Sequence, residues 1–157
     1  MTGERSPVRL DLTDDGLAAR LLAIQRAAYR VEADLIGSDA IPQLHESLYE
    51  LQATDETWHG LFVDSTVAGA ISHRVVDGVV DIHRLVVDPV FFRRGIARRL
   101  VEHLQATVEA REFIVSTGAA NTPARALYER LGYDAVGTEE VVPGLTIAHY
   151  RRVVAAD

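Results

Sequence analysis

The segment from residue 81 to residue 105, DIHRLVVDPVFFRRGIARRLVEHLQ, constrains the fold more than any other part of the sequence. In its first part, Ile82, Leu85, Val86 and Val87 form an apolar run rich in β-branched residues, and Asp88-Pro89 ends it, as is typical of a strand that runs into a turn. From Ile96 onward, apolar residues recur every three or four positions, which is typical of the buried side of an amphipathic helix. The sequence therefore predicts a strand, a turn and a helix here.

The turn before this helix, FRRGIA at residues 92–97, suits an anion. A helix start offers unpaired N–H groups and the positive end of the helix dipole, and the small residues Gly95 and Ala97 let a polyanion approach the backbone. A diphosphate is the ligand that best suits such a site, and the alternative is a basic helix start exposed to solvent. Four cations lie within seven residues of this stretch: Arg93, Arg94, Arg98 and Arg99.

These residues resemble motif A of the GNAT superfamily of acyl-CoA-dependent N-acyltransferases, whose pyrophosphate loop reads Gln/Arg-x-x-Gly-x-Gly/Ala. Gly95 and Ala97 match the two small positions, whereas Phe92 stands where the family usually has Gln or Arg. The resemblance implies that the phosphates of coenzyme A are bound by Arg93, Arg94, Gly95, Ile96, Ala97 and Arg98.

A second stretch, TGAANTPARALYERLGY at residues 117–133, is similar to GNAT motif B over its full length. The resemblance implies that Asn121 and Ala124 lie against the cofactor and that Tyr128 lies by its sulfur as a general acid toward the leaving thiolate. A tyrosine hydroxyl suits this role because its pKa of about 10 is near that of an alkyl thiol. The alternative is a core tyrosine whose hydroxyl reaches the surface.

The pattern along the chain predicts an α+β protein in a single domain over residues 1–157, and the resemblance implies one mixed, mostly antiparallel sheet with flanking helices. Strands are expected at 8–13, 58–63, 67–76, 81–87, 112–117, 133–142 and 145–154. A helix is expected after Thr13 or Asp14, followed by an irregular stretch at 31–43 and a second helix at about 42–53. Asp77-Gly78 predicts a hairpin turn.

In the fourth strand, the apolar residues Ile82, Leu85 and Val87 step by three and then by two, which predicts a bulge near residues 83–85. In GNAT proteins, such a bulge splays the fourth strand from the fifth and opens a slot for the pantetheine arm. The resemblance implies that the backbone at Leu85, Val86 and Val87 binds this arm, with one amide polarising the acyl carbonyl.

The region from residue 29 to residue 50 is rich in carboxylates and polar aromatic groups, and as a group they suggest a site for an amine. Tyr29, Glu32 and Glu46 are the candidate acceptor residues, against the alternative of ordinary solvated helix faces. His83 is the candidate general base, because its unperturbed pKa is the most suitable. The other candidate bases are Asp81, Glu46, Glu50 and Glu140.

Composition argues against several classes of function. The net charge of −7, from 16 basic and 23 acidic residues, argues against binding to nucleic acid or an anionic membrane. Without cysteine the chain has no thiolate nucleophile, and its six histidines show no metal-ligand spacing. No run of about 18 apolar residues and no signal-peptide core is present, which predicts a cytoplasmic protein.

The expected function is therefore transfer of an acetyl group from acetyl-CoA directly to a primary amine of a small molecule or a peptide. The acidic acceptor region favours a cationic small molecule, such as a polyamine or amino sugar, over an acidic peptide. A noncatalytic acyl-CoA-binding sensor or regulatory domain is the alternative, given Phe92 and the unassigned base. The sequence leaves open the acceptor, the acyl chain length and whether the protein is a monomer or a homodimer.

Overall fold

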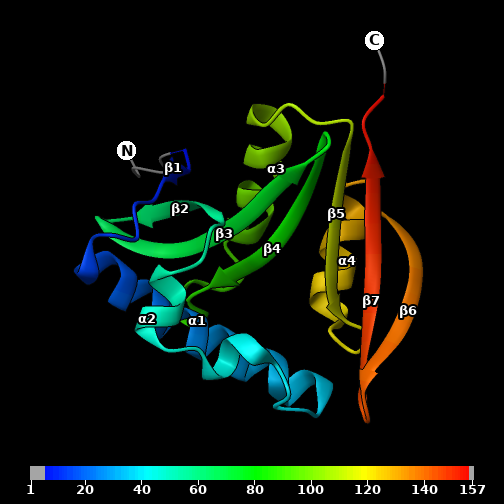
Figure 1. Cartoon of the computed structure of the whole chain (residues 1–157), viewed down its shortest axis with the longest axis horizontal. Helices are drawn as coiled ribbons and strands as arrows, with labels where there is room; N and C mark the ends of the chain where they lie inside the picture. Colours follow the sequence, from blue (N-terminus) through cyan, green and yellow to red (C-terminus); the bar gives the residue numbers. More distant parts are fainter. Residues whose placement is uncertain (1–5, 156–157) are drawn as a thin grey trace.

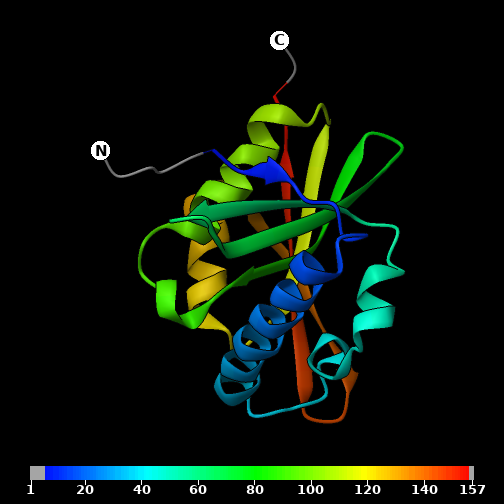
Figure 2. The same ribbon diagram turned by 90° about the vertical axis from the view of Figure 1, so that its left-hand side faces the viewer.

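The computed structural model describes residues 6–155, which form a seven-stranded sheet with helices on both faces (Figures 1 and 2). The strand order is β1-β2-β3-β4-β5-β7-β6, and only the β4–β5 pair is parallel. The strands are β1 (Val8–Arg9), β2 (Thr57–Val63), β3 (Thr66–Val76), β4 (Val79–Val87), β5 (Glu112–Gly118), β6 (Asp134–Val142) and β7 (Leu145–Val153).

Two groups of helices cover opposite faces of the sheet, and each seals its own apolar core. The first core lies under α1 and the short helices η1 and α2, and the second lies under α3 and α4. No helix of the described part is long and apolar enough to cross a membrane. The helices are α1 (Asp15–Ile36), η1 (Pro42–His45), α2 (Leu48–Gln52), η2 (Pro89–Phe91), α3 (Ile96–Thr107) and α4 (Thr122–Arg130).

The predicted bulge in β4 is confirmed. Ser72 pairs with Arg84 and the next residue, His73, pairs with Ile82, so His83 is the extra residue. An extra residue reverses the alternation of side chains along a strand. Accordingly Ile82 packs in the core under α3, whereas Arg84 points toward the α1 side, where it bonds Gln25 of that helix.

The predicted separation of the fourth and fifth strands is confirmed as well. Register pairs join β4 to β5 only from Val79–Glu112 to Ile82–Val115. Beyond Ile82 the two strands diverge, as Figure 1 shows, and β5 continues in partnership with β7. The backbone of β4 after the bulge therefore faces an opening instead of a neighbouring strand.

Three local expectations near the N-terminus were wrong. The first strand covers only Val8–Arg9, because the chain turns after it toward Asp14, which caps α1 by accepting from the Leu17 N–H. The stretch expected to be irregular from residue 31 is helical up to Ile36, because Ala33 and Ile36 continue the apolar side of α1. The helix ends at Gly37, which has a φ of 70°.

The helix expected at 42–53 is two short helices, η1 and α2. The break occurs at Ser47, whose hydroxyl accepts from the Glu50 N–H while the Glu50 carboxylate accepts from the Ser47 N–H. This capping box starts a new helix at Leu48 and is incompatible with a continuous one through the same residues.

Three histidine rings lie together between the sheet and α3: His59 on β2, His73 on β3 and His103 on α3. The ring centroid of His59 is 6.0 Å from that of His73 and 5.1 Å from that of His103. Burial, together with the positive charge of the other two rings and of Arg9, lowers the pKa of His59 from 6.5 to about 4. Burial also lowers the pKa of His73 and of His103.

We expect the free energy of unfolding to fall by about 1 to 2 kcal/mol when the pH is lowered from 7 to 5, after allowance for solvent screening of these half-buried rings. The folded-state pKa of each ring lies below its unfolded-state value, so the unfolded chain binds more protons in this range. The stabilisation is complete above the unfolded pKa and is lost as the pH falls. Urea unfolding at pH 7, 6 and 5 measures it, and His59→Gln should flatten the dependence. Equal slopes in the two proteins would contradict the assignment.

Candidate active site

Two pockets of about 480 Å³ each meet at the opening between β4 and β5. The first, called here the slot pocket, lies between the diverging strands, the C-terminal half of α1 and the β6–β7 hairpin. The second, called the loop pocket, lies between α1, the end of β4, the turn at residues 92–97 and the start of α4. Five residues line both pockets and mark where they join: Tyr29, Glu32, Leu85, Asn121 and Ala124.

Tyr128 of α4 lines the slot pocket with a side chain that is only 3% exposed. Burial raises the pKa of its hydroxyl above the ordinary value of 10.0, and nearby Tyr133, Tyr29 and Glu32 raise it further. The hydroxyl therefore stays protonated through the neutral range. It is able to donate a proton to a group in the slot.

The start of α4 is fixed by Asn121, whose side-chain oxygen accepts a hydrogen bond of 3.2 Å from the Ala124 N–H. Arg125 holds the same turn from behind, because its guanidinium donates to the Ala119 carbonyl and to the Tyr150 hydroxyl, each at 2.8 Å. These bonds fix the start of α4, where Asn121 and Ala124 line both pockets and Tyr128 lines the slot pocket.

The turn before α3 has the open backbone expected of an anion site. Arg93 and Gly95 have φ values of 66° and 73°, and a Cβ added at Gly95 would meet no atom within 4 Å. The helix start is pressed onto the sheet at Gly69, where a Cβ would lie 2.9 Å from Ile96 Cγ2. The start of α3 is therefore packed against the sheet at Ile96 and open at Gly95, next to the N–H groups that a first helical turn leaves without partners.

The other predicted cofactor residues divide into two groups. Arg93, Ala97, Val86 and Val87 line the loop pocket, and Leu85 lines both pockets. Four residues line neither pocket, because their side chains have other contacts or none. Ile96 is buried in the core, Arg94 lies over the Phe91 ring, Arg98 lies 3.3 Å from Glu102, and Gly95 has no side chain.

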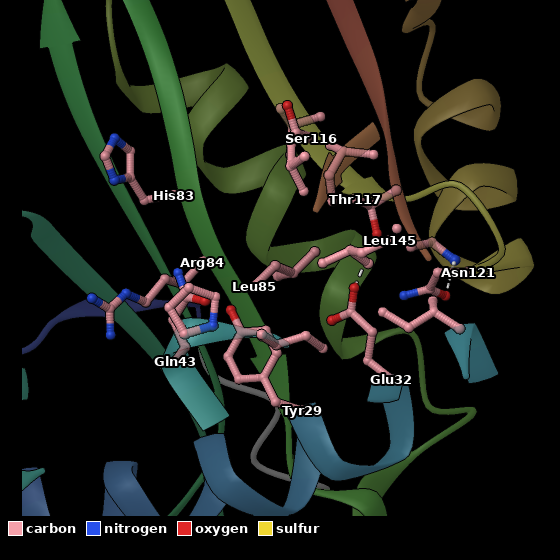
Figure 3. Close-up of a pocket in the computed structure, with 18 of the residues that line it drawn as sticks. Tyr29, Glu32, Gln43, His83, Arg84, Leu85, Ser116, Thr117, Asn121 and Leu145 are labelled. Atoms are coloured by element: carbon pink, nitrogen blue, oxygen red, sulfur yellow. Dashed lines mark hydrogen bonds between the residues drawn. The ribbon is translucent and has the colours of Figure 1, made fainter. Parts of the chain in front are cut away.

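The candidate acceptor residues are also divided. Tyr29 and Glu32, one helical turn apart on α1, both reach the slot, and Glu32 accepts a hydrogen bond of 3.4 Å from the Thr117 hydroxyl (Figure 3). Glu46 lines neither pocket, because its carboxylate binds Arg84 through two contacts of 2.5 and 3.0 Å. The negative charge of Glu46 is therefore paired with the positive charge of Arg84 within the protein.

Arg84 is the centre of a buried polar network that the sequence analysis missed. Its guanidinium contacts Glu46, Glu56 and the Gln25 side chain, with the last two at 3.2 and 3.1 Å. An arginine within the apolar run of β4 was a visible signal, but its partners come from α1, the end of η1 and the residue before β2. The network fixes the bulged part of β4 beside the slot.

His83 lines the slot pocket and is 29% exposed at its side chain. Its Nε2 lies 3.4 Å from the Asp81 carboxylate and its Nδ1 lies 3.8 Å from that of Glu56. Figure 3 shows His83 at the side of the pocket away from Glu32 and Asn121. Within residues 6–155, no group of three or more metal-binding side chains is arranged to hold a metal ion.

The family model described as "Acetyltransferase (GNAT) family" matches residues 18–133. The UPF0157 protein YqkA of Bacillus subtilis is 35% identical over 133 residues, 84% of this chain. The [ribosomal protein bS18]-alanine N-acetyltransferase of Salmonella typhimurium is 39% identical over 74 residues, 45% of this chain. The aligned regions span 39% and 49% of the lengths of these two relatives.

Solved structures share the fold at lower identity. The ribosomal-protein-S18-alanine N-acetyltransferase of Escherichia coli superposes with a TM-score of 0.76 at 21% identity, over 97% of this chain and 95% of that one. PaiA N-acetyltransferase from Thermoplasma acidophilum, in complex with coenzyme A, gives a TM-score of 0.72 at 16% identity, over 95% and 98%. At such identities the likeness concerns the fold alone.

Proposed function

The chain belongs to the GNAT acetyltransferase family, and from this premise we propose that it transfers an acetyl group from acetyl-CoA directly to a primary amine. Coenzyme A would lie along the loop pocket, with its diphosphate at the turn of residues 92–97 and its thioester end at the junction with the slot pocket. The amine would enter the slot pocket on the side of Tyr29 and Glu32.

The observation that carries this proposal is the position of Tyr128. It lines the slot that opens after Ile82, next to residues shared by both pockets, and its raised pKa keeps it protonated. A proton donor at the meeting point of two pockets suits a reaction in which a thiolate leaves as an amine attacks. The turn at Gly95 fits the diphosphate, because its backbone faces open space.

Each residue has a separate role in the proposed acetyl transfer. His83, which lies across the slot from Glu32, takes a proton from the ammonium group through water, and the freed nitrogen lone pair attacks the thioester carbonyl. A backbone amide of β4 near Leu85 to Val87 donates to the carbonyl oxygen as negative charge develops on it. The C–S bond breaks, Tyr128 gives its proton to the departing sulfur, and the acetylated nitrogen loses its remaining extra proton to solvent.

Support for the cofactor comes from the relative that was solved with coenzyme A. Support for an amine acceptor comes from the relatives named for acetylating an alanine of ribosomal protein S18. The competing function is an acyl-CoA sensor without turnover. It draws on Phe92, which is 43% exposed and lines the loop pocket where the family usually has a polar side chain.

The test is release of free thiol from acetyl-CoA with a panel of primary amines, together with calorimetric titration of coenzyme A. We expect binding and amine-dependent thiol release, with the acetylated amine identified by mass spectrometry. Binding of coenzyme A without turnover on any amine would support the sensor. Failure to bind coenzyme A would contradict both the acetyltransferase and the sensor function.

A Gly95→Val variant should raise the Kd of coenzyme A about tenfold or more. The new side chain would occupy the open space before α3 and would disfavour the φ of 73°. The matched control is Gly37→Val, because Gly37 has a φ of 70° and is equally open, but it ends α1 and does not precede α3. Calorimetry should show a weaker affinity only for the first variant, and unchanged affinity there would contradict the diphosphate site.

A further inference from the structure

The slot pocket has a charged inner end and an apolar outer end. At the inner end, Glu32 lines both pockets, lies 3.4 Å from the Thr117 hydroxyl and contributes to the raised pKa of Tyr29 and of Tyr128. The Glu32 carboxylate is therefore close to both tyrosines, at the entrance from the slot to the loop pocket (Figure 3). A group bound to Glu32 would be next to the proposed acetyl donor.

Glu32 is also the acidic side chain of the slot whose charge stays available. Arg84, the cation of the slot lining, is already paired with Glu46 and Glu56, while His83 lies between Asp81 and Glu56. No ion pair among residues 6–155 involves Glu32. The local charge is therefore negative, and an ammonium group is the ligand that neutralises it.

The outer end is built from two apolar walls that face each other. One comes from the end of α1 and the segment after it, and the other from the β6–β7 hairpin, which approaches this segment in both views of the fold (Figures 1 and 2). The first wall consists of Ile36, Ile41 and Pro42, and the second of Val142, Leu145 and Ile147. Val142 remains 42% exposed, so part of this apolar surface is uncovered.

This arrangement discriminates among amines. A second ammonium group or a sugar ring placed among Ile36, Val142 and Ile147 would lose part of its hydration to apolar side chains, which is unfavourable. An alkyl chain or an aromatic ring would bury apolar surface there, which is favourable by roughly fourfold in affinity per methylene group. The polyamine and amino-sugar acceptors suggested by the sequence therefore fit poorly.

We propose that the acceptor is a small primary amine carrying an apolar chain or ring, with its ammonium group bound by Glu32 and its apolar part between the two walls. This proposal rests on the proposed function and names the acceptor class of that same site. Glu32 acts here as a binding residue. A small molecule of this kind has a size that the slot pocket of about 480 Å³ accommodates.

The central comparison is between n-hexylamine and 1,5-diaminopentane, which have the same number of heavy atoms and differ in one terminal group. We expect kcat/KM for thiol release to favour n-hexylamine by about thirtyfold and to rise by about fourfold per methylene from butylamine to hexylamine. A Val142→Asp variant should reduce or reverse this preference, since it adds a carboxylate to the outer wall. Preference for the diamine, for glucosamine or for a peptide amino terminus would overturn the proposal while leaving acetyl transfer intact.

Glu32 is tested by binding as well as by rate. Glu32→Gln should raise KM for n-hexylamine about tenfold with a smaller change in kcat and no change in the Kd of coenzyme A. Asp34→Asn is the matched control, because it removes a carboxylate from an exposed position of the same helix. Calorimetry of n-hexylamine binding to the coenzyme A complex separates the two proposals, since it needs no turnover. Equal amine affinity in wild type and Glu32→Gln would overturn the assignment of Glu32.

Discussion

Tyr128→Phe is expected to lower kcat for thiol release by about a hundredfold or more, the range found when a general acid is removed. The change deletes one hydroxyl from a ring that is packed against Tyr133 and Tyr150, with centroid distances of 5.6 and 5.9 Å. The packing should survive, so the Kd of coenzyme A should remain near the wild-type value. Steady-state kinetics and calorimetry measure the two quantities separately.

The matched control is Tyr133→Phe. Tyr133 is as buried as Tyr128, lines neither pocket, and has a buried hydroxyl without a hydrogen-bond partner among the described residues. Removing that hydroxyl should leave kcat unchanged and raise the free energy of unfolding slightly, because an unsatisfied polar group is removed. Equal loss of kcat in the two variants would point to packing, and no loss in Tyr128→Phe would exclude Tyr128 as the acid.

The pH profile provides an independent check on Tyr128. Because burial raises the pKa of its hydroxyl above 10.0, the group remains a donor throughout the neutral range. Ionisation of Tyr128 should therefore cause no fall of the wild-type kcat between pH 7 and pH 9. A fall of kcat in this range that is present in wild type and absent from Tyr128→Phe would mean that the acid ionises at a much lower pH than the buried tyrosine allows.

Arg84→Met is expected to lower the free energy of unfolding by about 3 to 5 kcal/mol, the usual consequence of removing one partner from a buried ion pair. The Arg84 side chain is 6% exposed, and its loss leaves the carboxylates of Glu46 and Glu56, 13% and 5% exposed, without their cation. It also removes the contact of the guanidinium with the Trp58 ring. Urea unfolding at pH 7 measures the change.

Arg74→Met is the matched control on the neighbouring strand β3. Arg74 pairs with Asp55, and both side chains are largely exposed, so this change should cost less than about 1 kcal/mol. A second comparison adds Glu46→Gln and Glu56→Gln to Arg84→Met, which should recover much of the loss because the uncompensated charges are gone. A small effect of Arg84→Met alone would show that the network does not hold β4 at the bulge.

The local elements around the slot could be predicted because their signals are short-range. Asp88-Pro89 ends β4, the apolar spacing after Gly95 defines α3, and Asn121 caps α4, all within a few residues of the feature that they determine. The bulge at His83 was also readable, because an extra residue breaks the alternation of Ile82, Leu85 and Val87 on one strand. Each of these signals is a local steric or hydrogen-bonding requirement of the backbone.

The helix boundaries near the N-terminus were less predictable, because local signals alone did not decide them. The chemistry of Ser47 and Glu50 suffices to start α2, but the pattern of leucines around it equally suits one long helix. The continuation of α1 to Ile36 depends on the core against which Ala33 and Ile36 pack. Tertiary contacts therefore decided between two local structures of similar propensity.

The sequence by itself determined the strand, turn and helix around the proposed anion site, the order of the elements and the position of Tyr128, because each follows from neighbouring residues. Only the tertiary structure decided how the charges of the slot are distributed. Arg84 takes Glu46, 38 positions away, and Gln25, 59 positions away, and this pairing leaves Glu32 available at the inner end. The apolar outer end likewise exists only where the segment after α1 meets the β6–β7 hairpin. Pairing over such separations depends on the folded path of the whole chain, which no local pattern encodes.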